Sequence, residues 1–169
     1  PKRPRRRDPL LPVAQIGERD SIDVLQSSGV RVAMVTGDSK ETATAIGTSL
    51  GLLNDAKVVL SGYDIDKMTD RDLEEICERV AVYYRSCPRH KVRIVKALQR
   101  LGHIVAMTGD GVNDGVAIKT ADVGISMGVT GTDVCKEAAG VILLDDDFST
   151  ILSAVEEGKC IFYNIRNFV

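Results

Sequence analysis

Short apolar segments alternate with amphipathic segments along most of the chain, and this alternation predicts an α/β fold with a parallel sheet. The predicted strands are residues 31–36, 57–60, 80–84, 103–107, 122–126 and 140–144. Apolar residues at helical spacing predict helices over residues 20–28, 41–50, 69–80, 86–101, 132–139 and 148–169. Gly29, Gly51 and Gly102 follow three of these helices, as glycines commonly do at helix ends.

The composition supports one folded domain with an aliphatic core. Of 169 residues, 44% are hydrophobic and only 4% aromatic, which favours the Val, Ile, Leu and Ala core of a parallel sheet. No apolar run reaches the roughly 18 residues that suggest a membrane span, and the amino end shows no secretory signal. The four cysteines form no C-x-x-C pair, so we expect reduced thiols in a cytosolic compartment.

Charge is distributed unevenly between the amino end and the remaining chain. Residues 1–7 hold five of the 22 basic residues, which leaves 17 basic against 24 acidic residues, a net charge of −7. An acidic folded part argues against nucleic acid as a partner. We expect residues 1–19 to be a basic, Pro-rich flexible arm. A nuclear signal, a tether to phosphates or anionic lipid, and a plain flexible end are its alternative interpretations.

The stretch from Thr108 to Gly115, Thr-Gly-Asp-Gly-Val-Asn-Asp-Gly, is the strongest functional signal. It follows residues 103–107, which we interpret as a buried strand, so it lies where open α/β sheets bind ligands. Its glycines allow close approach of the backbone to a ligand. Asp110 and Asp114 supply two hard oxygen ligands, which with waters suit Mg²⁺ bound to phosphate. A solvated turn is the simpler alternative.

Thr36-Gly37-Asp38 repeats the first three letters of that stretch at the end of another predicted strand. A hydroxyl and free backbone amides near a helix start suit an anion, although Asp38 with Glu41 also fits a helix capping box. Lys91 lies in the first turn of a helix, where the helix dipole favours acids. It therefore either serves a nearby anion or is an exposed lysine of a basic helix.

Three further segments carry candidate chemistry. Asp64-Ile65-Asp66 has the D-x-D form of a phosphatase nucleophile, but it lies in a polar stretch and we discount it. Asp145 to Asp147 have the charge to bind a cation, yet acids preceding a helix more often cap it. Residues 149–169 have a broad apolar face, which fits approach to a membrane surface or docking on the domain's own core.

Five motifs occur in a fixed order along the chain. They are Thr36-Gly-Asp38, Pro88-Arg-His-Lys91, Thr108-Gly-Asp-Gly-Val-Asn-Asp114, Thr130-Gly-Thr-Asp-Val-Cys-Lys-Glu-Ala-Ala139 and Asp145-Asp-Asp-Phe148. The series resembles the phosphorylation domain of P-type cation-transporting ATPases over residues 20–169. Within that family it is most similar to the secretory-pathway Ca²⁺/Mn²⁺ pumps, which have Val where sarcoplasmic-reticulum-type pumps have Pro, as at Val116 here.

The resemblance implies a haloacid-dehalogenase-like (Rossmann-like) parallel sheet with helices on both faces, and it assigns roles to the motif residues. The residues that would hold, orient or neutralise the phosphoryl group are Thr36, Gly37, Asp38, Lys91 and Asn113. The residues that would hold Mg²⁺ are Asp110 and Asp114. Phosphoryl transfer of this kind depends mainly on positioning and charge neutralisation.

The resemblance also implies a larger parent protein. In the family, ATP phosphorylates an aspartate and drives cation transport, so the implied partners are Mg²⁺, ATP, the other pump domains and transported Ca²⁺ or Mn²⁺. The implied location is the cytosolic face of a Golgi or secretory-pathway membrane. The chain contains no Asp-Lys-Thr-Gly-Thr, which would carry the phosphorylated aspartate. We therefore expect an inactive fragment, soluble in the cytosol, with a partial phosphorylation domain at 20–148 and a stalk-like helix at 149–169.

In the implied fold, the strand bearing the phosphorylated aspartate lies between residues 31–36 and 103–107. We expect a gap in the sheet there, unless residues 10–16 or a partner fill it, and only marginal folding of the chain alone. Two other functions remain open from the sequence. One is a non-catalytic module that regulates a membrane protein or binds an anionic membrane surface. The other is a haloacid-dehalogenase-like phosphatase.

Overall fold

The computed structural model describes residues 18–54 and 56–168, with the backbone alone from residue 159, and its strands form two parallel sheets. The first sheet has the order β1-β3-β2, with β1 at Met34–Val35, β2 at Val58–Ser61 and β3 at Val80–Tyr84. The second has the order β4-β5-β6, with β4 at Ala106–Gly109, β5 at Val123–Met127 and β6 at Val141–Leu143. All pairings within the sheets are parallel, which confirms the predicted fold class.

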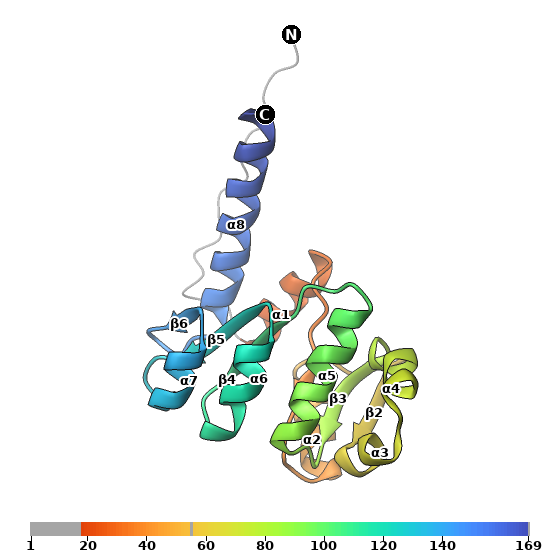
Figure 1. Ribbon diagram of the computed structural model, residues 1–169. Coiled ribbons are helices and arrows are strands. Elements are labelled where there is room, and N and C mark those ends of the chain that lie inside the picture. Colours follow the sequence, from red (N-terminus) through yellow and green to blue (C-terminus); the bar gives the residue numbers. More distant parts are fainter. Residues whose placement is uncertain (1–17, 55, 169) are drawn as a thin grey trace.

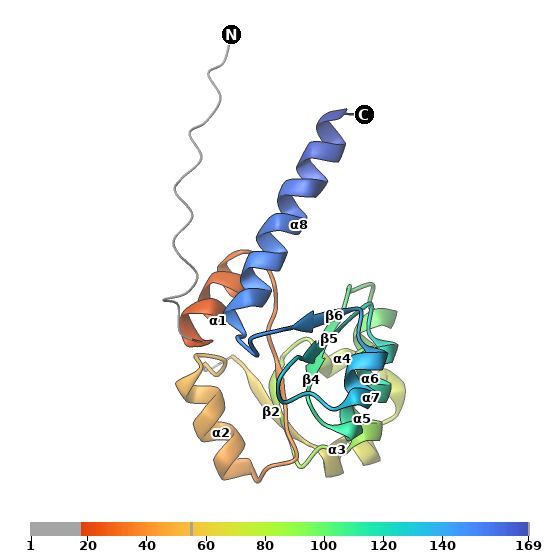
Figure 2. The same ribbon diagram turned by 90° about the vertical axis from the view of Figure 1, so that its left-hand side faces the viewer.

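Helices connect the strands in alternation. They are α1 (Glu18–Ser27), α2 (Lys40–Ser49), α3 (Gly62–Lys67), α4 (Asp70–Cys77), α5 (Pro88–Arg100), α6 (Gly115–Thr120), α7 (Asp133–Ala138) and α8 (Ser149–Phe168). Figure 1 shows β2 and β3 with α3, α4 and α5 on one side of the molecule, and β4 to β6 with α6 and α7 on the other. Helix α8 extends away from both groups (Figures 1 and 2). Within the described part of the chain, no helix is both long and apolar enough to cross a membrane.

Polar residues at the helix starts explain why several helices begin where they do. The hydroxyl of Ser61 accepts the backbone N–H of Asp64, whose carboxylate in turn accepts from Ser61, and this capping box begins α3. Thr69 begins α4 in the same way, as predicted. Helix α2 is capped by the Ser39 side chain, so the capping box suggested for Asp38 and Glu41 is wrong.

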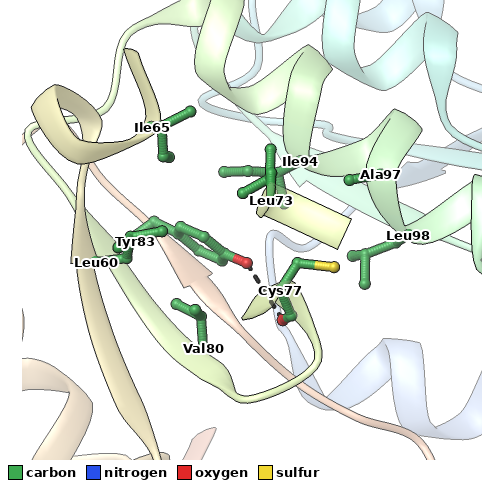
Figure 3. Packing of buried hydrophobic residues seen from close by; sticks show 9 residues of the cluster. All are labelled: Leu60, Ile65, Leu73, Cys77, Val80, Tyr83, Ile94, Ala97 and Leu98. Carbon is green, nitrogen blue, oxygen red and sulfur yellow. Dashed lines mark hydrogen bonds between the residues drawn. The ribbon is translucent and has the colours of Figure 1, made fainter. Parts of the chain in front are cut away.

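Two hydrophobic clusters lie on opposite faces of the first sheet. The larger one contains Leu60, Ile65, Leu73, Cys77, Val80, Tyr83, Ile94, Ala97 and Leu98 (Figure 3). Within it, the Tyr83 hydroxyl donates a hydrogen bond to the Cys77 carbonyl at 3.3 Å, and burial raises the pKa of Tyr83. The second cluster contains Ile22, Ala43, Leu52, Ala81 and Val82. Helices α3, α4 and α5 therefore cover one face, and α1 and α2 cover the other.

The strand predicted at 103–107 is not buried as the sequence suggested. Strand β4 begins only at Ala106, which is exposed, and the preceding Ile104 is 80% exposed. The strand predicted at 31–36 is reduced to the two residues of β1, which are only partly buried. By contrast β3, which has a neighbour on each side, buries its first four residues completely or nearly so. The difference arises because β1 and β4 are edge strands.

A gap separates β1 from β4. Among the described residues, β1 pairs only with β3 and β4 only with β5, so each strand has one unpaired edge. Cavities of about 400 and 440 Å³ lie between these strands, and Val35 and Met107 line both. Native interiors contain few voids larger than a water molecule. The gap is therefore a feature of the architecture, at the position where the sequence implied a missing central strand.

The two halves are held together by helix packing across this gap. Helix α5 packs against α4 in the first half and against α6 in the second, and α1 packs against α8.

We predict that backbone amides facing the gap exchange with solvent faster than amides paired within each sheet. The Thr36 N–H donates to the Tyr83 carbonyl at 2.9 Å, so alternation along β1 turns the Val35 N–H toward the gap. Hydrogen exchange followed by NMR should give lower protection for Val35 than for Thr36. Equal protection of the two amides would show that the sheets close on each other in solution.

Candidate functional site

The loop Thr36–Asp38 follows β1 and is closed by its own side chains. The Thr36 hydroxyl donates to Asp38 Oδ2 at 2.7 Å and accepts the Asp38 backbone N–H at 3.2 Å. The loop is tied to the end of β3, because Arg85 N–H donates to the Asp38 carbonyl and Ser86 N–H to the Thr36 carbonyl. Its position is therefore fixed relative to the start of α5.

The second loop follows β4 and folds back tightly on itself. Thr108 and Gly109 end the strand, and a short 3₁₀ helix, Val112–Asp114, leads into α6. A Cβ atom at Gly109 would lie 2.5 Å from the Asp114 Cβ, so only glycine fits there. The Cys135 thiol of α7 donates to the Gly111 carbonyl at 2.8 Å, which holds the loop from the opposite side.

Lys91 and Asp114 form an ion pair between the two halves of the molecule. Lys91 lies in the first turn of α5, which follows the first sheet, and Asp114 follows β4 of the second sheet. Both side chains are largely buried, with 15% and 9% of their surfaces exposed. Removing one partner of such a pair leaves a buried charge without compensation, which typically costs about 3–5 kcal/mol. Lys91 also lines one of the two cavities between β1 and β4, so the pair lies beside the gap.

The start of α5, and with it Lys91, is positioned by contacts that the sequence did not reveal. His90 is 3% exposed, and its Nδ1 accepts the Cys87 backbone N–H at 3.1 Å. The Nε2–H therefore donates to Asp66 at 2.8 Å, and Arg89 donates to the same carboxylate at 2.7 Å. The His90 hydrogen bond, with Arg89, lowers the pKa of Asp66. Asp64 and Asp66 are thus engaged in structural contacts, and neither is free as a nucleophile.

The predicted site residues are brought together in two separate groups. Thr36 and Asp38 form one group, and Lys91 with Asp114 forms the other. Gly37 lies exposed at the tip of the first loop, and the side chains of Asp110 and Asn113 are also exposed. In the described part of the chain, no hydrogen bond or ion pair joins the Thr36–Asp38 loop to the loop after β4.

Two buried hydroxyls beside these loops were not predicted. Ser86 Oγ and Thr132 Oγ1 have no hydrogen-bond partner among the described residues. Their backbone N–H groups bond the Thr36 and Asp110 carbonyls, so one hydroxyl flanks each loop. Thr132 lies inside the motif 130–139, which was its only signal in the sequence.

The acidic residues fit a metal that is shared with a second ligand. Among the described residues, no three His, Cys, Asp or Glu side chains form a cluster that would hold a metal ion. Asp110 offers a free carboxylate, while one oxygen of Asp114 is already paired with Lys91. Because Mg²⁺ keeps several waters and takes one or two carboxylates plus phosphate oxygens, the set fits Mg²⁺ bound jointly with a phosphoryl group.

The acids before α8 fasten a loop. Asp146 has a positive φ of 55° and accepts the backbone N–H groups of Val129 at 2.9 Å and Thr130 at 2.7 Å. The Thr130 hydroxyl donates to it as well. These hydrogen bonds lower the pKa of Asp146 to about 2. Asp147 accepts the Ser149 N–H at the helix start, so the predicted capping role is confirmed.

Comparison with known proteins places the chain among cation-pump sequences. The family described as haloacid dehalogenase-like hydrolase matches residues 18–122. Calcium-transporting ATPase type 2C member 1 of Homo sapiens is 57% identical over 160 residues, which cover 95% of this chain and 17% of that protein. Calcium-transporting ATPase type 2C member 2 of Homo sapiens is 56% identical with the same coverage. The chain therefore spans less than a fifth of the length of these curated relatives.

More distant relatives show the same pattern. Calcium-transporting ATPase 1 of Schizosaccharomyces pombe is 54% identical over 158 residues, which cover 89% of this chain and 18% of that protein. A solved structure of the catalytic domain of the CPx-ATPase CopB-B matches with a TM-score of 0.61 and 26% identity, covering 83% of this chain and 45% of the other.

We predict that the contribution of Asp146 to stability disappears in acid. Its folded-state pKa of about 2 lies below the ordinary 3.8, so its stabilising effect is complete above pH 4 and is lost as the pH falls toward 2. Asp146→Asn should lower the urea midpoint at pH 7 and pH 5, and the deficit should shrink at pH 3. Asp23→Asn on α1 controls for the loss of one negative charge. A deficit that stays constant down to pH 3 would contradict the assignment.

Proposed function

Because the chain belongs to the haloacid dehalogenase-like hydrolase family, we propose that it is part of the phosphorylation domain of an ATP-driven Ca²⁺/Mn²⁺ pump. In this proposal it supplies the loops that bind Mg²⁺ and the phosphoryl group. The identity of 57% to a calcium-transporting ATPase, over only 17% of that protein's length, supports a partial sequence of such a pump. The other pump domains are then its partners.

The observation that carries the proposal is the Lys91–Asp114 pair beside the gap. A lysine held at this position neutralises the charge of a phosphoryl group, and Asp114 is its counter-ion when no phosphoryl group is bound. Thr36 and Gly37 donate hydrogen bonds to phosphoryl oxygens from a hydroxyl and a backbone N–H, while Asp38 shapes that loop.

The second loop completes the proposed site. Asn113 has an exposed amide free to donate to the phosphoryl group, and Asp110 has a free carboxylate for Mg²⁺. Asp114 supports the metal through the oxygen that Lys91 does not engage. The bound Mg²⁺ supplies charge neutralisation during phosphoryl transfer.

The chain alone lacks the group that accepts the phosphoryl. No Asp-Lys-Thr-Gly-Thr occurs in the sequence. The acids of the D-x-D segment are engaged with Ser61, His90 and Arg89, which argues against a free-standing phosphatase. We therefore propose that the chain is inactive by itself, and that the parent uses ATP at the cytosolic face of a Golgi or secretory-pathway membrane. The basic arm considered for membrane binding lies outside the described residues.

We predict that the isolated chain forms no phosphoenzyme. After incubation with radiolabelled ATP, Mg²⁺ and Ca²⁺ or Mn²⁺, acid precipitation should recover no hydroxylamine-labile label on the protein. A full-length calcium-transporting ATPase treated in parallel is the positive control. Acid-stable, hydroxylamine-labile label on this chain would overturn the proposal of inactivity.

We also predict weak Mg²⁺ binding that depends on Asp110. Asp110→Ala should reduce Mg²⁺ affinity at least about tenfold, a loss that even outer partners of metal ligands can cause. Mg²⁺ titration in the presence of orthophosphate, followed through the amide signal of Gly111, measures this affinity. Asp23→Ala, far along α1, is the matched control and should leave the affinity unchanged. An unchanged affinity in Asp110→Ala would remove Asp110 from the metal site.

A further inference from the structure

We propose that the gap between β1 and β4 is a slot for one extended, largely apolar strand supplied by another polypeptide. The strand would lie parallel to both edges and join the two sheets into one. The slot is defined by residues 33–35 of the first half and 104–107 of the second, with the cavities on either face between them. The inference rests on the divided sheet and is independent of the Mg²⁺ and phosphoryl assignments.

The backbone on both sides of the slot lacks partners of the kind a strand provides. Alternation along β1 directs the N–H and C=O groups of Val35 into the slot, because the Thr36 N–H is bonded to Tyr83. In β4, the Val123 N–H bonds the Val105 carbonyl, so Ala106 and Thr108 direct their groups into the slot from the other side. One inserted strand would pair with both edges through its own two rows of N–H and C=O groups.

The cavities explain which side chains the strand would carry. One cavity lies toward the face covered by α1 and α8, where it meets Ile22, Phe148 and Ile151. The other lies toward α5, where it meets Ile94 and Leu98. Successive side chains of a strand point to opposite faces, so its residues would enter the two cavities in turn. Because both are lined by aliphatic and aromatic groups, the fitting sequence is a continuous apolar run, as in other buried parallel strands.

The two edges run in the same direction, which selects a parallel strand. The cavity beside α5 is bordered at one end by Val30 and Ile104, which precede β1 and β4. Toward the carboxyl ends of both strands it is bordered by Val35, Met107 and Lys91. A strand that is buried on both faces between two parallel neighbours completes a uniform parallel sheet.

The sequence of this chain argues that the occupant comes from elsewhere. All six strands of the described residues already have places in the two sheets. The apolar segment 10–16, considered above, contains Pro12, which has no N–H and is disfavoured in a central strand that must bond on both sides. A second copy of the chain has the same shortage of a spare apolar strand.

The experiment uses the full chain and a synthetic peptide of five alternating Val, Ile and Ala residues flanked by lysines, in buffer without Mg²⁺ or phosphate. We expect saturable binding by fluorescence anisotropy and at least tenfold slower hydrogen exchange of Val35 and Thr108. The same peptide with its central amide N-methylated should not bind, because it cannot complete the ladder. Binding of both peptides alike, or of neither, would overturn the proposal. Because no metal is present, this result is separate from the test of the Mg²⁺ site.

A matched pair of variants locates the binding. Met107→Lys places a charge inside the slot and should abolish peptide binding, whereas Ile142→Lys on β6, at the outer edge of the second sheet, should leave it unchanged. Circular dichroism checks that both variants fold. If Met107→Lys fails to fold, exchange protection confined to Val35 and Thr108 in the unmodified chain decides the question. Protection at the outer edges β2 and β6, or protection of Val35 by concentration-dependent dimerisation, would contradict a heterologous strand in this slot.

Discussion

A parallel strand carries hydrogen-bonding groups on both edges, and the structure is governed by the fact that β1 and β4 are each paired on one edge only. The unpaired edges face the same gap, so the residues beside them lose the burial that a central strand would have. This explains the short β1, the exposure of Ile104 and the cavities lined by Val35 and Met107. It also explains why the candidate site is assembled as two groups, because its loops follow strands on opposite sides of the gap.

Helix α5 compensates for part of this division. It packs against elements of both halves and presents Lys91 to Asp114 across them. Its first turn is fixed by His90, which bonds Cys87 within the turn and Asp66 on α3. The chemistry proposed for Lys91 therefore depends on a buried histidine and an exposed acid that take no part in phosphoryl binding themselves. Mechanical continuity between the halves and placement of the candidate cation come from the same helix.

Much of the fold was predictable from local sequence. Strand β3 lies at the predicted residues 80–84, Thr69 caps α4, and the acids at 145–147 fasten the start of α8, because caps and apolar runs act over a few residues. The capping box at Asp38 failed because the neighbouring Ser39 hydroxyl takes that role. The burial expected for 103–107 failed because an apolar run does not reveal whether its strand has a neighbour on each side.

The sequence by itself determined the order of helices and strands, the two loops that begin Thr-Gly-Asp, and the family to which they belong. These follow from residue types and spacing, which are local properties of the chain. Only the tertiary structure decided that Lys91 pairs with Asp114, that His90 and Asp66 hold α5, and that the sheet is divided into two. Each of these joins residues more than 20 positions apart, or depends on a missing neighbour, and distance in space is not encoded in local pattern.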